Sequence, residues 1–168
     1  MKNLVYIFFT VCLFACQSEE LTIISEENGS ELSIVPPNSD EYLTYRVDDQ
    51  MPITYFEHIS CMLQPSQIVI SHITDMGNGE IQEFRLEFGK AGDLPLDLGK
   101  YNVINGLRIS DDHGNKIDYE TTSNIEAEIT TIGERVGDYV DVNFSGTFID
   151  EVGAEHTIIG LVHAYRDN

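Results

Sequence analysis

The chain has 168 residues, of which 29 are acidic and nine are basic, and its formal net charge is −20. This length suits a single domain. So acidic a composition excludes a nucleic-acid-binding role, because such binding depends on lysine and arginine side chains that neutralise phosphates. An anionic membrane surface would repel the chain for the same reason. The charge fits a soluble exposed domain, and divalent-cation binding remains an alternative.

The N-terminus has the pattern of a secretion signal. Lys2 is followed by an apolar run from Leu4 to Ala15 that contains no charged residue. The run is too short to cross a bilayer, which takes about 20 apolar residues, but it suits the core of a signal peptide. We therefore expect residues 1–15 to be removed from the mature protein.

Cys16 is the expected lipidation site. Residues 13–16 read L-F-A-C, which resembles the lipobox of bacterial lipoproteins: an aliphatic residue, a tolerant position, a small residue and a cysteine. In that family the cysteine thiol takes a diacylglycerol, and the signal is removed just before it. The resemblance implies that the membrane is a partner through Cys16, since two or more acyl chains at about 0.8 kcal/mol per buried CH₂ anchor a protein stably.

The residues behind Cys16 predict an export route and a tether. Residues 17–20 read Q-S-E-E, which resembles the surface-export signal of Bacteroidota lipoproteins and implies an outer-membrane protein that faces the cell surface. Residues 16–41 contain no basic residue and include Asn28-Gly29 and Pro36-Pro37. This composition is typical of a flexible linker, so we expect a lipidated N-terminus and an acidic tether over residues 16–41.

From residue 42 onward the patterns predict β-strands. Apolar and polar residues alternate in Asp138–Ile149, Asn124–Ile132 and Glu80–Phe88, as in strands with one face in a core and one in water. Short strands separated by Gly, Asn and Asp turns indicate a sandwich or barrel. We therefore predict an all-β fold: one antiparallel β-sandwich domain over residues 42–168.

One strand of this sandwich allows a sharper prediction. Val140, Val142, Phe144 and Phe148 share a face, which we expect to form one wall of the core. Gly146 lies between the two phenylalanines, where we expect it to mark a close approach to a facing strand or a local bulge. Aromatic residues at core-phase positions elsewhere are Tyr45, Tyr101, Phe84 and Phe88.

Three segments resemble small β-sandwich lipoproteins of Bacteroidota whose function is unknown. L-T-Y-R-V-D-D-Q at 43–50 resembles their opening strand, and L-G-K-Y-N-V at 98–103 a central strand. V-N-F-S-G-T-F-I-D at 142–150, followed after a turn by H-T-I-I-G-L-V-H-A at 156–164, resembles their closing hairpin. The resemblance implies a β-sandwich and brings no catalytic residues with it.

The acid-rich segment D-D-H-G-N-K-I-D offers the only candidate metal ligands. A calcium loop requires oxygen ligands at alternate positions around a glycine turn, but the glycine here comes early and His113 takes an oxygen position. A hairpin turn explains Asp, Gly and Asn equally well. We predict a hairpin and no cofactor, with calcium as the alternative; its ligands would be Asp111, Asp112, Asn115 and Asp118.

No catalytic motif emerges from the remaining residues. The histidines lack the spacing of a metal pair; His156 and His163 should lie on opposite strand faces, with His163 a satisfied, partly buried residue. G-x-S-x-G is absent, and Cys61 is expected to be a buried apolar residue. Tyr42, Tyr119 and Tyr139 are too few exposed aromatics to indicate a sugar cleft.

Two classes of function remain open. The favoured one is a non-enzymatic binding or structural module on the cell envelope, whose protein or glycan partner the sequence does not identify. The other is a hydrolytic enzyme with an unrecognised site. A third possibility, a lipocalin-like carrier, requires a hollow barrel.

Overall fold

The computed structural model describes residue 34 and residues 36–77, 79–92, 94–104, 106–118, 121 and 123–168. The expected signal peptide, Cys16 and most of the expected tether lie outside the described residues. No helix among the described residues has the length and apolarity to cross a bilayer.

The described part of the chain contains eleven strands, and the alternating segments noted above all fall on strands. Their bounds are β1 Tyr42–Val47, β2 Ile53–Tyr55, β3 Ile59–Gln64, β4 Gln67–Asp75, β5 Ile81–Gly89, β6 Gly99–Val103, β7 Leu107–Ser110, β8 Lys116–Ile117, β9 Ser123–Ile132, β10 Tyr139–Ile149 and β11 Glu155–Tyr165.

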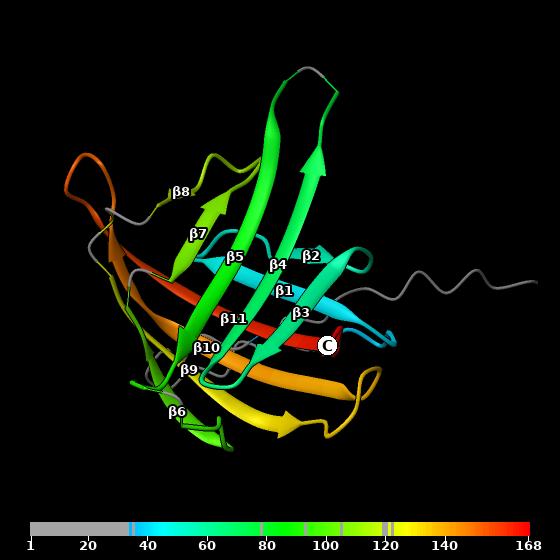
Figure 1. Cartoon of the computed structure of the whole chain (residues 1–168). Helices are drawn as coiled ribbons and strands as arrows, with labels where there is room; N and C mark the ends of the chain where they lie inside the picture. The colour runs from blue at the N-terminus through cyan, green and yellow to red at the C-terminus, as the bar shows by residue number, and fades with distance from the viewer. Residues whose placement is uncertain are drawn as a thin grey trace, which may run out of the picture.

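The strands form two antiparallel sheets that pack face to face (Figure 1). The first has the order β2-β1-β11-β10-β9-β6, and the second has the order β3-β4-β5-β7-β8. The predicted all-β antiparallel sandwich is therefore confirmed. The β4–β5 hairpin extends well beyond the other strands of its sheet (Figure 1).

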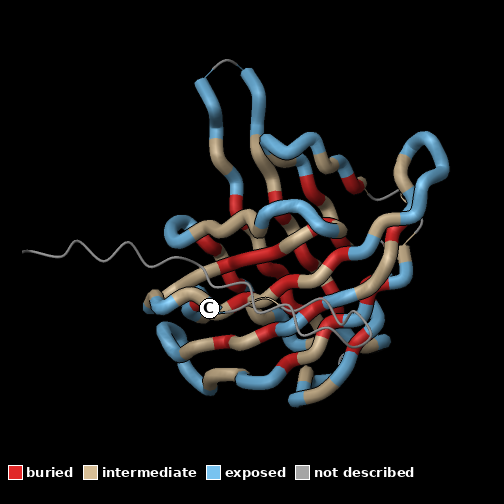
Figure 2. The backbone as a smooth tube through the Cα atoms, turned by 180° about the vertical axis from the view of Figure 1, so that it is seen from behind, coloured by how far each residue is buried: buried red, intermediate tan, exposed pale blue. Residues whose placement is uncertain are grey.

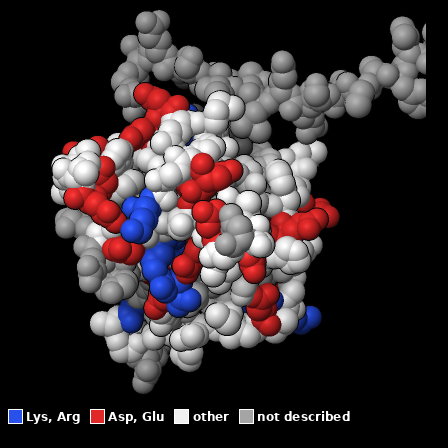
Figure 3. Space-filling model, turned by 90° about the horizontal axis from the view of Figure 1, so that it is seen from above, with Lys and Arg blue, Asp and Glu red and all other residues white. Residues whose placement is uncertain are grey.

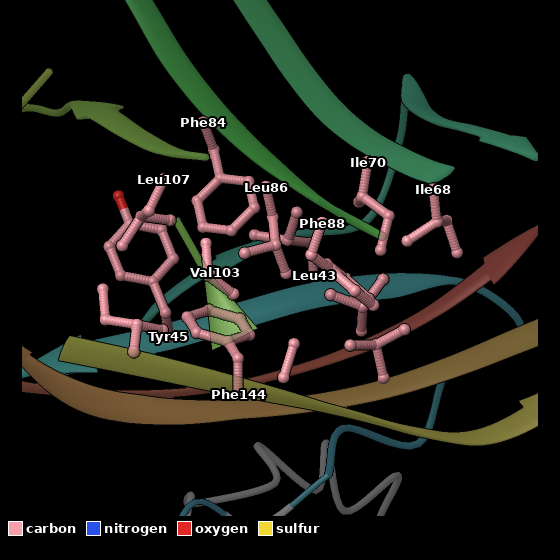
Figure 4. Close-up of a cluster of buried hydrophobic side chains, with 14 of the residues drawn as sticks. Leu43, Tyr45, Ile68, Ile70, Phe84, Leu86, Phe88, Val103, Leu107 and Phe144 are labelled. Carbon is pink, nitrogen blue, oxygen red and sulfur yellow. The ribbon is translucent and has the colours of Figure 1, made fainter. Parts of the chain in front are cut away.

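Large side chains from both sheets meet between them (Figure 4). The ring centroids of Phe84 and Phe144 are 5.7 Å apart, and those of Tyr45 and Phe84 are 5.3 Å apart. Burial is concentrated in the middle of the strands, while the turns are exposed (Figure 2). The predicted wall is confirmed, since its members are all buried: Val140, Val142, Phe144 and Phe148.

Gly146 marks the close approach of β9, its paired neighbour in the same sheet. A Cβ at this position would lie 2.1 Å from the backbone oxygen of Asn124 on β9. The bulge of this strand pair lies elsewhere, at the register shift between Asp141 and Val142.

The resembled segments occupy different places in the sheets. The segment at 142–164 does form a hairpin, β10 with β11. Residues 99–103, expected to be a central strand, form β6, which is the edge of the six-stranded sheet. This expectation was wrong because a strand central in the sequence need not be central in its sheet. The two central positions of this sheet belong to β11 and β10, which pair with each other.

The C-terminal tail covers the edge of the five-stranded sheet at β3. Asp167 Oδ2 accepts hydrogen bonds from the Ser60 hydroxyl at 2.7 Å and from Cys61 N–H at 2.8 Å. Asn168 Oδ1 accepts a bond from Leu63 N–H at 2.7 Å. Cys61 is buried, as expected, and burial raises the pKa of its thiol to about 12.

Candidate functional site

The segment at 111–118 is a hairpin loop. It follows β7 and contains β8, and these two strands pair antiparallel across the turn at 111–115. Asp111 holds the turn, because its carboxylate accepts bonds from the N–H groups of His113 at 3.0 Å and of Asn115 at 2.9 Å. The hairpin interpretation is therefore confirmed.

The four candidate calcium ligands do not converge on one point. Asp111 and Asn115 are bonded to each other, while Asp118 bonds to Thr121 beyond β8. Asp112 is exposed. In the part of the chain that the structure describes, His, Cys, Asp and Glu form no cluster of three or more suited to a metal ion.

Tyr45, a core residue of β1, holds this loop in place through a hydrogen bond. Its side chain is fully buried and its hydroxyl donates a bond of 2.9 Å to Asp111 Oδ2. Burial, together with the nearby Tyr55 and Asp111, raises the pKa of Tyr45 well above its usual range. Asn115 Nδ2 donates to Gln50 Oε1 at 3.0 Å, which ties the β7–β8 loop to the β1–β2 turn.

His72 is a buried, satisfied histidine at the base of the β4–β5 hairpin. Its Nδ1 lies 3.1 Å from the Glu57 carbonyl oxygen, and its Nε2 lies 2.8 Å from the Thr74 hydroxyl. The ring stacks on Tyr55 at a centroid distance of 3.9 Å. Burial lowers the pKa of His72, so a neutral imidazole is favoured here.

Beyond His72 the hairpin carries exposed apolar side chains. Ile73, Met76 and Ile81 are 58%, 51% and 57% exposed, respectively. Phe56, in the segment beside the base of the hairpin, is 51% exposed. We call these four residues the apolar tip.

The apolar tip is surrounded by acidic residues. The sequence segments 48–59 and 73–83, which supply it, contain no lysine or arginine. Figure 3, which views the molecule from the hairpin side, shows acidic side chains spread over this face, with a group of basic ones near its middle and smaller basic patches towards its edges. Arg85 and Arg108 lie directly opposite each other on β5 and β7, below the tip.

His156 is held between two carboxylates from two different turns. Its Nδ1 lies 2.7 Å from Asp48 Oδ2, and its Nε2 lies 3.2 Å from Asp150 Oδ2. The hydrogen bonds with Asp48 and Asp150 raise the pKa of His156. Burial acts to raise the pKa of Asp48, but bonds from His156 and Thr157 outweigh it and lower that pKa. We call these three residues the histidine clamp.

His163 lies on the outer face of β11, opposite to His156, as predicted. It bonds to Asp141 and stacks between Tyr42 and Tyr139, with centroid distances of 5.5 and 4.0 Å. Tyr139 stacks in turn on Tyr165 at 4.5 Å. The rings of this row cover one another, so the expectation of a satisfied, partly buried histidine is confirmed. Tyr119 lies outside the described residues.

Sequence reasoning missed the histidine clamp and the apolar tip. Turn residues supply both aspartates of the clamp, and nothing in their local pattern shows that they meet. The tip had a signal, since Ile73 and Ile81 flank the Gly-Asn-Gly turn at 77–79. Comparisons with protein families, with curated proteins and with solved structures find no match.

Proposed function

We propose that this chain is a lipid-anchored protein of the bacterial outer membrane, displayed at the cell surface, and that its β-sandwich is a non-enzymatic binding or structural module. The observation that carries the proposal is the L-F-A-C sequence at residues 13–16, which follows a charged start and a short apolar run. Q-S-E-E at residues 17–20 supports export to the surface.

The geometry of β1 is compatible with display on a tether. The tether would join the sandwich at Tyr42, and the β1–β2 turn begins at Asp48. A strand of this length separates the two by about 20 Å at about 3.3 Å per residue. The β7–β8 loop, bonded to that turn, is therefore held away from the point of attachment.

The filled interior supports a module over a carrier. Tyr45, Phe84 and Phe144 lie in the space between the sheets (Figure 4), where a carrier would hold its ligand.

Metabolic labelling with an alkynyl fatty acid in the host bacterium tests the anchor. We expect label on the wild type and on Cys61→Ala, the matched cysteine control, and none on Cys16→Ala. Mass spectrometry should find Cys16 as the modified first residue. An intact Met1 or an unmodified Cys16 would refute the anchor.

Protease treatment of intact cells tests the display. The wild type should be cleaved, while a variant with Glu19→Ala and Glu20→Ala should be protected. Protection of both proteins would contradict surface export.

The hydrolytic alternative has one observation in its favour. The Thr74 hydroxyl, His72 Nε2 and the Glu57 carbonyl at His72 Nδ1 have the order of a nucleophile, a base and an orienting group. Esterase activity of the purified protein that disappears in Thr74→Val would favour this alternative. Equal rates in both proteins would remove it.

A further inference from the structure

We infer that the apolar tip docks onto a partner protein whose contact surface is an apolar groove bordered by lysine and arginine side chains. The inference deepens the proposed function, on which it rests only in taking the sandwich to be a binding module.

The end of the β4–β5 hairpin projects beyond the strands that flank it in the sheet. Strand β3 pairs with β4 only as far as His72, and β7 pairs with β5 only as far as Glu83. Beyond these residues, in the described part of the chain, β4 and β5 pair only with each other. Figures 1 and 2 show this hairpin as an exposed arm. An arm of this shape fits a concave partner better than a flat one.

Two of the exposed apolar residues, Ile73 and Ile81, lie on one side of the arm. Ile81 is opposite Asp75, and Ile73 is opposite Glu83, so the two isoleucines are diagonal neighbours on the outer face of the hairpin. Met76 follows at the end of β4. Single exposed apolar residues are ordinary on protein surfaces, but a group of them indicates an interaction site. Methionine is frequent at binding surfaces because its side chain adapts to the partner.

The charge around the tip selects the kind of partner. Acidic residues flank it on each segment that supplies it: Glu57, Asp75, Glu80 and Glu83. Complementary potentials steer association and like charges oppose it. A partner with a basic rim is therefore attracted, and an anionic lipid surface is repelled. A second copy of this chain would bring the same carboxylates together, which disfavours self-association through this tip.

Site-specific photo-crosslinking of the full-length protein in intact host cells tests the inference. The probe is p-benzoylphenylalanine at Met76, and the control carries the same probe at Val152. Val152 is also apolar and is 88% exposed, but it lies in the β10–β11 turn. We expect an adduct with one protein from position 76, none from position 152, and loss of the adduct when Ile73→Ser and Ile81→Ser are added.

Binding of the identified partner to the purified, detergent-solubilised full chain gives the quantitative test. We expect Ile81→Ser to raise Kd at least tenfold, because Ile81 is exposed and its replacement should not unfold the domain. Glu57→Gln with Glu83→Gln, and a change from 50 to 500 mM NaCl, should each raise Kd as well.

Several results would overturn the inference: no adduct from position 76, an adduct of two copies of this chain, an adduct with lipid, or a Kd that Ile81→Ser leaves unchanged. A Kd that falls on removal of the carboxylates would overturn it too. Cys16→Ala separates this inference from the proposed function. If that variant stays membrane-bound and labelled, the anchor at Cys16 is wrong, while the Kd values still decide the role of the tip.

Discussion

Phe144 and Gly160 lie directly opposite each other on β10 and β11, and the ring of Phe144 occupies the space that a side chain at position 160 would need. A Cβ at position 160 would lie 2.1 Å from Cζ of Phe144. The ring cannot move away freely, because it packs against Phe84 at 5.7 Å. The glycine is therefore required by packing.

Gly160→Ala should lower the free energy of unfolding by about 1–3 kcal/mol, the usual cost of overpacking a core. Equilibrium urea unfolding measures it. In a Phe144→Leu background, which removes the ring, the same substitution should cost less. Equal costs in both backgrounds would show that the ring is not what excludes the side chain.

The two faces of β10 should respond differently to truncation. Phe144→Ala should cost about 3–5 kcal/mol of unfolding free energy, because it removes a buried ring. Asn143→Ala, on the exposed face, should stay within about 0.5 kcal/mol. Urea midpoints of the two variants decide the matter. Similar midpoints would mean that the faces are wrongly assigned.

Asp111 and Asp112 are neighbours with different roles. Asp111→Ala should destabilise the domain by about 1–3 kcal/mol, because it removes the carboxylate that accepts a bond from the buried Tyr45 hydroxyl and holds the turn. Asp112→Ala, at an exposed position, is the matched control and should cost less than about 0.5 kcal/mol. Thermal unfolding with and without CaCl₂ adds a check. A rise in Tm with calcium that depends on both aspartates would restore the calcium site.

The histidine clamp should make stability depend on pH. The pKa of His156 is raised in the folded protein, so its contribution is fully present below its ordinary value of about 6.5 and is lost as the pH rises through the folded value. The lowered pKa values of Asp48 and Asp150 place their contribution above about 3.8. The clamp is therefore strongest between these two limits.

His156→Gln should lower Tm more at pH 5.5 than at pH 9. His113→Gln, at an exposed loop position, provides the control and should leave Tm unchanged at both values. A difference for His156→Gln that is the same at both pH values would show that the contribution of its side chain is not electrostatic.

The sequence predicted what depends on local periodicity. Alternation gave the buried faces of β5, β9 and β10, and Gly, Asn and Asp marked the turns between strands. It could not predict which strands are neighbours, because pairing is decided by packing across the sheet. The placement of residues 99–103 failed for this reason, since β6 lies at an edge.

The candidate sites also differ in whether the local sequence predicts them. Asp111 holds a hairpin turn, as its local sequence indicated. The contact of His156 with Asp48 and Asp150 was not predictable, because each of the three residues has an ordinary role within its own segment. Only the fold brings the β1–β2 turn next to the β10–β11 hairpin.

The pairing of β1 with β11 has a consequence for when the domain can fold. Residues 42–47 find their partners in residues 158–163, so the six-stranded sheet is incomplete until the last strand has been synthesised. The edge of the five-stranded sheet at β3 is covered later still, because the residues that cover it are Asp167 and Asn168. Such long-range pairings form slowly compared with local ones. A growing chain with this topology therefore cannot close its sandwich before β11 has been synthesised, whereas the strands of the five-stranded sheet pair in the order in which they leave the ribosome.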